Sequence, residues 1–333
     1  MTTVYAAYED ALLAVDDATG EPSARLSLDG YRPECVLADE GRLFVGTFDS
    51  GLLRSTAGGE SWERLDGVEE DAVMSIAVAP DDPQTLYAGT EPSAVYRSQD
   101  GGQSWKRLKG LTDVPSADRW SFPPRPHTHH VRWLEPAPGD PELLYVGIEA
   151  GALVRGYLDG SADGDDIVTW GDRVERSRVD THTITTHPDR PGHAWVAAGD
   201  GYAETDDWGD SWGHPKAGLN HTYCWSVAVD AADPECVLIS SASGAGSAHR
   251  APGEAYLYRK QGDRWERLET DLPTGEGALR AVLQRGEVGG VFWAGNNHGL
   301  YRTTDGGDSW QALQIDWPDR FTDQTCRGLA VVA

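Results

Sequence analysis

Short hydrophobic runs with alternating polar positions recur along the whole chain, and none shows a convincing helical period. The segment Val73–Leu108 contains four such runs separated by turn residues, and Leu279–Leu313 repeats the same layout. Short runs rich in β-branched and aromatic residues, bounded by Gly, Asp, Asn and Pro, are typical of strands joined by hairpins. The pattern therefore predicts an all-β protein built from repeated four-stranded antiparallel sheets.

A signature turn joins the third and fourth runs of the repeat. Three copies fit the Asp-box pattern S/T-x-D-x-G-x-S/T-W: Ser98–Trp105, Thr205–Trp212 and Thr303–Trp310. Ser55–Trp62 has Ala57 in place of the Asp, Tyr258–Trp265 keeps the Gly and the Trp, and Trp170 keeps only the Trp. In this turn Asp accepts backbone N–H groups, Gly supplies a positive φ and Trp packs between sheets. These residues are therefore structural.

Counting the repeats predicts the architecture. Six full copies lie at about 33–65, 71–108, 129–175, 180–213, 222–268 and 278–313. The first 28 residues supply runs that match the second, third and fourth strands of a repeat, and Arg327–Val332 matches a first strand. Pairing 327–332 with 3–28 would close the ring and remove exposed sheet edges. We expect residues 1–333 to form a single domain, a seven-bladed β-propeller.

The repeats resemble the BNR/Asp-box superfamily over nearly the whole chain. That superfamily includes sialidases and other glycoside hydrolases, sortilin-type receptors and photosystem II assembly factors of the Ycf48 type. The resemblance implies a propeller whose functional site lies where the first strand of each blade meets the central funnel. It does not select a chemistry, because the superfamily contains both enzymes and non-enzymes.

Charge excludes two classes of partner. The chain has 54 acidic and 28 basic residues and a formal net charge of −26, so it lacks the basic surface that nucleic acid or an anionic membrane requires. Only four basic residues are lysines. Many dispersed carboxylates and few lysines resemble haloarchaeal proteins, which stay soluble at molar salt. No basic or apolar leader precedes the first strand-like run at Val4–Tyr8, so we expect a cytoplasmic protein.

Candidate functional residues gather on the face opposite the Asp boxes. Aligning the first strands places six residues at one position, called here the strand-start position: Met74, Arg132, His182, Trp225, Arg280 and Arg327. Other residues on this face precede that position or follow the second strands: Arg32, Asp49, Glu91, His127, His129, His130, Glu149, Asp180, Asp200, His221, Tyr223, Ser243, Asn296, Asn297 and His298. Six of the ten histidines map to this face, mostly on the fourth to seventh blades. This uneven distribution predicts a ligand site.

Arginines are candidates for holding an anion. Arg132, Arg280 and Arg327, with Arg32 as a fourth candidate, could clamp a carboxylate, because the guanidinium group matches a carboxylate bidentately. Trp225, Asn297 and His298 complete the predicted ligand-binding set. Tyr31-Arg32-Pro33 is weakly similar to the F/Y-R-I-P motif of sialidases but lacks the isoleucine. The expected partner is a small polar or carboxylate-bearing molecule.

Carboxylates and imidazoles offer two further chemistries. Glu149, Asp180, Asp200 and Tyr223 are the catalytic candidates for a glycosidase-like hydrolase or lyase, which needs two carboxylates about 5–10 Å apart. His130, His182 and His221, with His129 as a further candidate, could bind zinc, manganese or iron together with Glu149 or Asp200. Such a metal would activate water or act as a Lewis acid.

Two insertions suit a different function. Thr112–Thr128 contains Trp120, Phe122 and four prolines, and Gly244–Glu254 interrupts a later repeat. Aromatic residues among prolines often mark recognition surfaces. The sequence therefore favours a propeller that binds a small anionic ligand, with hydrolase or lyase activity, and leaves a non-catalytic protein-binding scaffold as the alternative. The substrate and the oligomeric state do not follow from the sequence.

Overall fold

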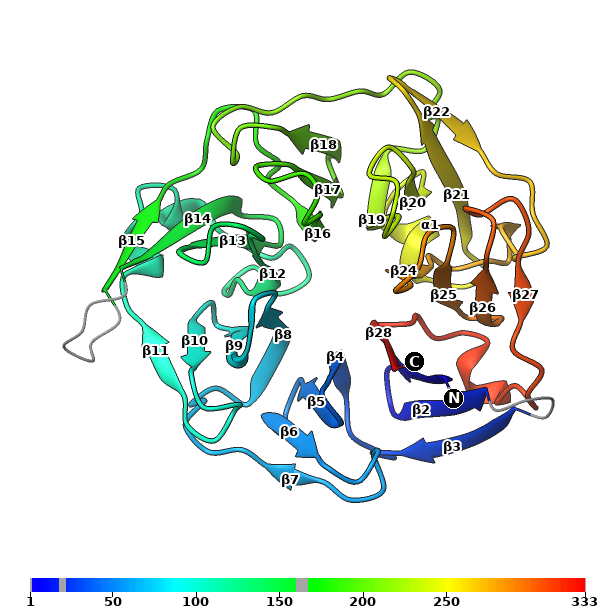
Figure 1. The fold of residues 1–333 in the computed structure, drawn as a ribbon, viewed down its shortest axis with the longest axis horizontal. Helices are drawn as coiled ribbons and strands as arrows, with labels where there is room; N and C mark the ends of the chain where they lie inside the picture. The colour runs from blue at the N-terminus through cyan, green and yellow to red at the C-terminus, as the bar shows by residue number, and fades with distance from the viewer. Residues whose placement is uncertain (1, 18–21, 160–166, 333) are drawn as a thin grey trace. The chain divides into compact units, whose positions relative to one another are not determined.

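The strands form seven antiparallel sheets, as the repeat count predicted. The structure is a computed structural model that describes residues 2–17, 22–159 and 167–332. Within most sheets the strands follow one another in chain order from one edge to the other (Figure 1). The fold class is therefore confirmed as a seven-bladed β-propeller. Residues 18–21 and 160–166 of the predicted blades lie outside the described residues.

The chain divides into two compact units, and unit 1 contains both ends of the chain. It comprises Met1–Ala38, Gly199–Tyr202 and His214–Ala333. One sheet has the order β28 (Gly328–Val332), β1 (Thr2–Ala7), β2 (Leu12–Asp17) and β3 (Ser23–Ser27). Another contains β19 (Tyr223–Val229), β20 (Val237–Ala242), β21 (Glu254–Gln261) and β22 (Arg264–Arg267), with β23 (Gly275–Glu276) paired to β21. A third contains β24 (Val282–Arg285), β25 (Phe292–Asn296), β26 (Gly299–Thr303) and β27 (Gln311–Ala312).

Unit 2 comprises Asp39–Ala198 and Ala203–Gly213. One of its sheets contains β8 (Ala72–Ala79), β9 (Asp82–Glu91), β10 (Val95–Ser98) and β11 (Lys106–Leu108). The next contains β12 (Val131–Pro136), β13 (Leu143–Ile148), β14 (Ala152–Asp159) and β15 (Ile167–Gly171). The expectation of a single domain over 1–333 stays a prediction.

The two remaining sheets differ in completeness. One contains β4 (Pro33–Asp39), β5 (Arg42–Thr47), β6 (Leu52–Ser55) and β7 (Glu63–Arg64). The other contains β16 (Thr181–Thr186), β17 (Ala194–Ala198) and β18 (Gly201–Thr205). A single bridge between Glu204 and Gly213 stands where its fourth strand was predicted. The segment after this Asp box pairs with β18 through this one bridge, which is too few pairs to form a strand.

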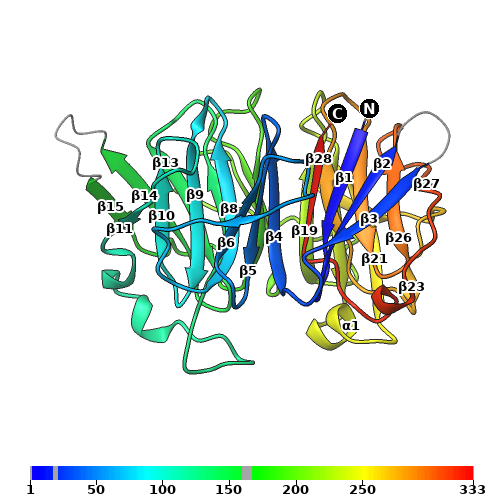
Figure 2. The same ribbon diagram turned by 90° about the horizontal axis from the view of Figure 1, so that it is seen from below.

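Helical elements are short turns outside the sheets. They are η1 (Leu111–Asp113), η2 (Ala117–Arg119), α1 (Ala245–His249) and η3 (Asp319–Phe321). In Figure 2, α1 lies beyond the ends of the strands of unit 1. No helix in the described part of the chain has the length and apolar character that a bilayer crossing requires.

The C-terminal strand completes the N-terminal sheet, which confirms the predicted closure. β28 pairs antiparallel with β1 in a register that sets Ala330 opposite Tyr5 and Leu329 opposite Ala6 (Figure 2). Because β1 also pairs with β2, it has a neighbour on both sides. The sheet therefore joins segments from the two ends of the chain, and its β1 edge is not exposed.

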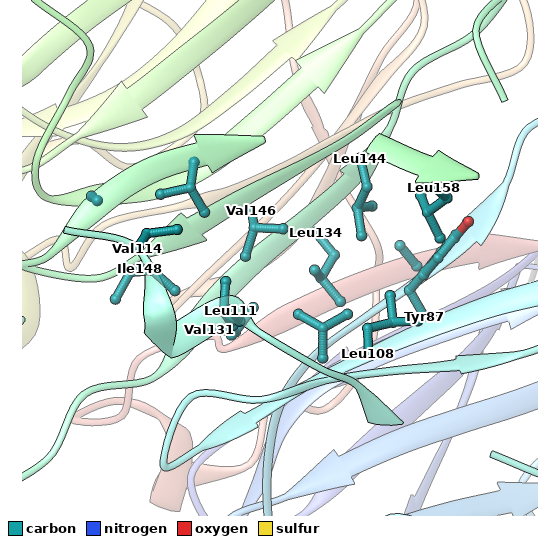
Figure 3. Close-up of a cluster of buried hydrophobic side chains, with 14 of the residues drawn as sticks. Tyr87, Leu108, Leu111, Val114, Val131, Leu134, Leu144, Val146, Ile148 and Leu158 are labelled. Atoms are coloured by element: carbon teal, nitrogen blue, oxygen red, sulfur yellow. The ribbon is translucent and has the colours of Figure 1, made fainter. Parts of the chain in front are cut away.

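Apolar side chains of neighbouring sheets interlock to form the core of unit 2. Figure 3 shows Tyr87 and Leu108 of the β8–β11 sheet facing Leu134 and Leu144 of the β12–β15 sheet. Val114 and Trp120, which lie in the Thr112–Thr128 insertion, join the same cluster, and all these side chains are buried. Side chains from alternate strand positions fill the space between two packed sheets in this way. The insertion is thus anchored in the core rather than extended into solvent.

The Asp boxes fold as their pattern predicted. Asp305 accepts hydrogen bonds from the backbone N–H of Ser309 at 3.0 Å, from its hydroxyl at 2.6 Å and from the hydroxyl of Thr303 at 2.7 Å. Slight burial would raise the pKa of Asp305, but these hydrogen bonds outweigh it and lower that pKa to about 2. Trp310 is buried, and its indole N–H donates to the carbonyl of Gly307. The box residues are therefore occupied in holding the turn.

The incomplete box at Ser55–Trp62 can be tested by restoring its aspartate. Ser55 already accepts the N–H of Gly59 at 2.9 Å, as Ser98 accepts that of Gly102 in the complete box. We expect Ala57→Asp to raise the free energy of unfolding by about 1 kcal/mol, because the new carboxylate can accept hydrogen bonds from Ser61. Urea denaturation at constant high salt measures the change, with Asp100→Ala as the reverse control. Equal stabilities of the wild type and Ala57→Asp would contradict the prediction.

Candidate functional site

The strand-start position coincides with a β-bulge in four sheets. In each case the register of the first strand pair skips one residue, and the skipped residues are Met74, Arg132, His182 and Trp225. A bulge leaves its extra residue outside the ladder and redirects the side chain. The bulge is therefore the structural reason that these four side chains depart from the alternating pattern of their strands. The sequence alignment does not show this bulge.

Six of the predicted candidates come together in unit 2 as a cluster, called here the acid–histidine cluster. Its members are Glu91, His130, Arg132, Glu149, Asp180 and His182. They lie at the ends of β9 and β13 and at the starts of β12 and β16. The loop after the second strand of one sheet and the segment leading to the first strand of the next thus contribute to the same site.

Glu149 is the centre of this cluster. His130 donates through Nε2 to Glu149 Oε2 at 2.9 Å, and Arg132 Nε lies 3.8 Å from the same oxygen. His182 Nε2 lies 3.9 Å from the other carboxylate oxygen. Burial would raise the pKa of Glu149, but the hydrogen bond from His130 and the proximity of His130, His182 and Arg132 hold that pKa well below its usual range. Glu149 therefore stays ionised and suits a metal ligand, but it is a weak base and not a general acid.

Asp180 brings a second carboxylate to the cluster. Its Oδ1 accepts the backbone N–H of Ala150 at 2.8 Å, directly after Glu149, and lies 3.7 Å from His182 Nε2. One donor atom each from Glu149, Asp180 and His182 lie within 4.8 Å of one another. The side chain of Asp180 is 29% exposed, whereas that of His182 is fully buried. The three residues therefore form a set that could hold a metal ion and that solvent reaches on the aspartate side.

The long insertion covers the other side of the cluster. Arg125 donates through Nε to Glu91 Oε1 at 2.7 Å and through Nη2 to the second oxygen. Its guanidinium carbon lies 4.8 Å from the ring of Phe122, and that ring meets His130 edge to face at 4.7 Å. His130 itself is only 1% exposed. The insertion thus encloses His130 and neutralises Glu91.

A second group of candidates lies in unit 1, around Arg280. Its guanidinium carbon stands 3.6 Å above the ring of Trp225, and its Nη1 donates to the carbonyl of Cys326 at 2.6 Å. Its Nε donates to His249 Nδ1 at 3.2 Å. Tyr223 Oη lies 3.0 Å from His249 Nε2. Arg280, Trp225, His249 and Tyr223 therefore form one connected group, called here the Arg280 group.

The other two arginines of the predicted clamp have different surroundings. Arg327 Nη1 donates to both carboxylate oxygens of Glu34, at 3.0 and 2.8 Å, and its Nη2 lies 3.7 Å from Glu9. Arg32 is exposed. A guanidinium already paired with a buried carboxylate has less attraction for an anionic ligand. The clamp of Arg132, Arg280 and Arg327 stays a prediction, and the contacts of Arg327 favour a structural role.

Asn297 and His298 hold a turn. The side-chain oxygen of Asn297 accepts the N–H of Leu279 at 2.8 Å, and its amide group donates to the carbonyls of Gly277 and Thr322. His298 Nε2 lies 2.9 Å from the carbonyl oxygen of Gly277. These contacts join the loop after β25 to the segment before β24, so both side chains have backbone partners.

His221, His129 and Asp200 are the remaining predicted candidates. His221 Nδ1 lies 2.6 Å from the hydroxyl of Tyr258, and its ring stacks on Tyr256 at 4.3 Å. Burial, followed by the neighbouring His130, lowers the pKa of His129, whose ring meets Trp120 edge to face. Asp200 is exposed. The partners of His221 are therefore tyrosines of unit 1 rather than a shared metal set.

Three residues of these groups were not on the predicted site list. His249 lies in the Gly244–Glu254 insertion and Arg125 in the Thr112–Thr128 insertion. The sequence indicates both insertions but not which of their polar side chains reach the site. Glu34 follows the Tyr31-Arg32-Pro33 segment. A polar residue inside an insertion next to aligned strand-start residues was the one signal that could have indicated the first two.

Comparisons with known proteins identify the fold. No family model matches the chain, and no curated protein matches it. Among solved structures, an ancestral GH74 enzyme matches with a TM-score of 0.60 and 12% identity over 90% of this chain, which spans only 38% of that structure. Ycf48 bound to D1 peptide matches with a TM-score of 0.53 and 15% identity, covering 93% of this chain and 89% of the other. Ycf48 from Cyanidioschyzon merolae matches with a TM-score of 0.56 and 13% identity, covering 88% of each chain. The chain therefore shares its propeller fold with a GH74 enzyme and with Ycf48, and the resemblance of its repeats to Asp-box propellers is confirmed at the level of the fold.

Proposed function

We propose that the protein is a propeller that binds a divalent cation at Glu149, Asp180 and His182 and uses it to hold and hydrolyse a small polar ligand. The observation that supports this proposal is the convergence of one donor atom from each residue within 4.8 Å. Two ligands of one zinc ion are at most about 4 Å apart, twice a bond of about 2.1 Å. The donor atoms therefore need to move by less than about 1 Å each to share an ion.

The charge of the cluster also favours a cation. Glu91, Glu149 and Asp180 contribute three carboxylates, whereas Arg125 and Arg132 contribute two guanidinium groups. With neutral histidines the cluster has a net charge of about −1, which attracts a cation. A bound divalent ion would change this net charge to about +1, which would then attract an anionic ligand. His182 Nε2 lies near the carboxylates of both Glu149 and Asp180. A metal bound to this nitrogen would replace the proton that it could otherwise carry between these two carboxylates.

Three protein ligands leave an open coordination position. In catalytic zinc sites that position holds a water molecule whose acidity the metal increases. Here Asp180 is the ligand that reaches solvent, while Glu149 is buried and oriented by His130. Orientation of a ligand by a second residue is typical of metal sites that function. The arrangement is therefore suited to metal-assisted hydrolysis, and zinc, manganese and iron all accept such ligands.

Calorimetry on metal-free protein prepared without a nickel column tests the proposal. We expect one equivalent of Zn²⁺ or Mn²⁺ to bind, and Asp180→Asn to weaken binding at least 10-fold. Asp81→Asn is the matched control, because Asp81 is an exposed carboxylate of the same unit that does not belong to the converging ligand set. p-Nitrophenyl acetate serves as a general probe for metal-dependent hydrolysis. Absence of stoichiometric binding, or equal losses in both variants, would contradict a metal site at these residues.

A protein-binding scaffold is the second candidate function. The observation in its favour is that a Ycf48 structure with the same fold over most of its length is a complex with D1 peptide. We infer that a peptide partner of this chain would be basic, because the chain has a net charge of −26. A metal-free protein that binds basic peptides and hydrolyses no ester would favour this alternative.

A further inference from the structure

Arg125 of the long insertion lies against a buried carboxylate and an aromatic ring. The carboxylate is Glu91, the last residue of β9, and the ring is Phe48, directly after β5, so both follow the second strands of two consecutive sheets in unit 2. Arg125 donates to both oxygens of Glu91, and its guanidinium carbon lies 4.9 Å from the centre of the Phe48 ring. Glu91 and Phe48 therefore form a pocket, called here the Phe48–Glu91 pocket, that the chain fills with its own arginine.

The chemistry of this pocket selects a guanidinium group. A guanidinium is planar, and its fork of N–H donors matches the two oxygens of one carboxylate. Its cationic plane is also attracted to an aromatic ring. The ammonium group of lysine is a compact point charge and does not satisfy a carboxylate bidentately. The Phe48–Glu91 pocket is therefore suited to arginine rather than to lysine.

The two partners of this ion pair differ in burial. The side chain of Glu91 is 7% exposed, whereas that of Arg125 is 33% exposed. A buried carboxylate that loses its counter-charge is strongly destabilised, so Arg125 leaves readily only where another cation takes its place. The carboxylate is thus the fixed part of the pocket, and the arginine is the part that solvent and a partner can reach.

The loop that carries Arg125 is held together by its own backbone. The N–H of Phe122 donates to the carbonyl of Thr128 at 2.9 Å, the N–H of Arg125 to the carbonyl of Phe122 at 2.8 Å, and the N–H of Thr128 to the carbonyl of Arg125 at 3.0 Å. Residues 123, 124, 126 and 127 are exposed, while Trp120, which precedes the loop, is buried in the core. A movement of the loop as a unit keeps these internal hydrogen bonds, so Arg125 can withdraw without unfolding the insertion.

We propose that the Phe48–Glu91 pocket is a docking site for an arginine side chain of a protein partner, and that Arg125 is an internal occupant which the partner's arginine displaces. Arg125 stands between Pro124 and Pro126, whose rings restrict the backbone that presents it. The partner that fits best is therefore an exposed segment with a proline-flanked arginine, since a pre-organised segment loses less entropy on binding. The net charge of −26 attracts such a basic segment. This docking site does not depend on a metal at Glu149, and it gives the basic partner of the scaffold alternative a specific chemistry.

Calorimetry with a peptide that copies residues 122–127, acetyl-Phe-Pro-Pro-Arg-Pro-His-amide, tests the docking site on the full chain at constant salt with a chelator present. We expect the peptide to bind Arg125→Ala about 10-fold more tightly than the wild type, because no internal arginine then competes for Glu91. Arg125→Lys leaves Glu91 its counter-charge and so protects the fold, but it removes the fork. This variant should bind the peptide about 3-fold more tightly than the wild type.

Arg155→Ala is the matched control. Arg155 also belongs to unit 2, its Nη1 lies 2.8 Å from Asp210 Oδ1, and its guanidinium carbon lies 5.7 Å from the centre of the Tyr157 ring. Asp210, however, is 74% exposed, so removing Arg155 empties no buried pocket. We expect Arg155→Ala to bind the peptide as the wild type does.

Two further measurements identify what the pocket recognises. A peptide with lysine in place of arginine should bind Arg125→Ala about 10-fold more weakly than the arginine peptide. Adding Glu91→Gln to Arg125→Ala should remove the gain in affinity, while it leaves no buried charge unpaired. If both Arg125 variants bind the peptide no better than the wild type, Arg125 is only structural and the proposal is wrong. If N-acetylarginine amide binds as tightly as the peptide, the ligand is a small guanidinium compound and the protein partner is wrong. Because the chelator removes metal ions, failure here remains distinguishable from failure of the metal site.

Discussion

Replacing Glu149 by glutamine is expected to weaken Zn²⁺ or Mn²⁺ binding at least 100-fold and to lower the free energy of unfolding by about 3 kcal/mol. The first effect follows because the substitution removes one of three converging ligands. The second follows because Glu149 is the buried partner of His130, Arg132 and His182, and removing one member leaves the others without their counter-charge. No other single substitution in unit 2 is expected to affect both properties so strongly.

The matched control is Glu91→Gln. Glu91 is also a buried carboxylate and also pairs with an arginine, Arg125, but it does not belong to the converging ligand set. We expect this variant to lose stability while its cation affinity stays within about 3-fold of the wild type. Calorimetry measures the affinity, and urea denaturation measures stability without changing the ionic strength. Equal affinities for Glu149→Gln and the wild type would remove Glu149 from the site.

The pH dependence of stability gives a second measure of Glu149. Its pKa is lower in the folded protein than in the unfolded chain, so its contribution is complete above the unfolded pKa of about 4.3. It is lost as the pH falls below that value, because the unfolded state then binds a proton that the folded state does not. Glu149→Gln lacks this term, so the stability difference between the wild type and the variant should shrink as the pH falls below about 4.

Most of the fold could be predicted because its signals are local. Each Asp box is a turn whose aspartate, glycine and tryptophan are within eight residues, so the sequence alone indicates where third and fourth strands meet. The match of Arg327–Val332 to a first strand followed from the same repeat. The reduced fourth strand of the β16–β18 sheet was not predicted, because Trp212 keeps the box complete while the ladder beyond Gly213 depends on tertiary packing.

The site could be predicted only in part. The alignment of first strands indicated Arg132, His182 and Trp225 as site residues. In the structure each of these residues lies at a β-bulge, which redirects its side chain out of the ladder pattern. The partners that give these residues their chemistry come from insertions, and nothing in a repeat alignment predicts where an insertion folds back. His249 reaches Arg280 from 31 residues away, and Arg125 reaches Glu91 from 34. The haloarchaeal adaptation and the cytoplasmic location stay predictions.

The predicted arginine clamp depends on three residues that are equivalent in the sequence but have different surroundings in the structure. In sequence, Arg132, Arg280 and Arg327 are equivalent positions of a repeat. In the structure one faces Glu149, one lies on Trp225 and one faces Glu34, so the three differ in how much positive charge they can offer. Equivalent positions of a propeller can thus have different roles, since the loops that surround them are not repeated.

Replacing Arg327 by methionine is expected to lower the free energy of unfolding by about 3 kcal/mol, because it leaves Glu34, whose side chain is 6% exposed, without its bidentate partner. Arg327 directly precedes β28, and its backbone N–H donates to the carbonyl of Ala7, so the loss should appear as weaker attachment of the C-terminal strand. Hydrogen exchange of β28 amides measures this attachment, and urea denaturation measures the total.

A double-mutant cycle separates the two roles that Arg327 could have. If the arginine mainly compensates Glu34, adding Glu34→Gln to Arg327→Met should restore about 2 kcal/mol of the lost stability, because no buried charge is then left unpaired. Lys is not an adequate substitute, since Arg327 spans both carboxylate oxygens of Glu34 with one nitrogen and approaches Glu9 with the other. A ligand clamp predicts the opposite: unchanged stability in Arg327→Met and weaker binding of acetate or phosphate. The larger of the two effects therefore decides whether the last strand-start arginine holds the fold or the ligand.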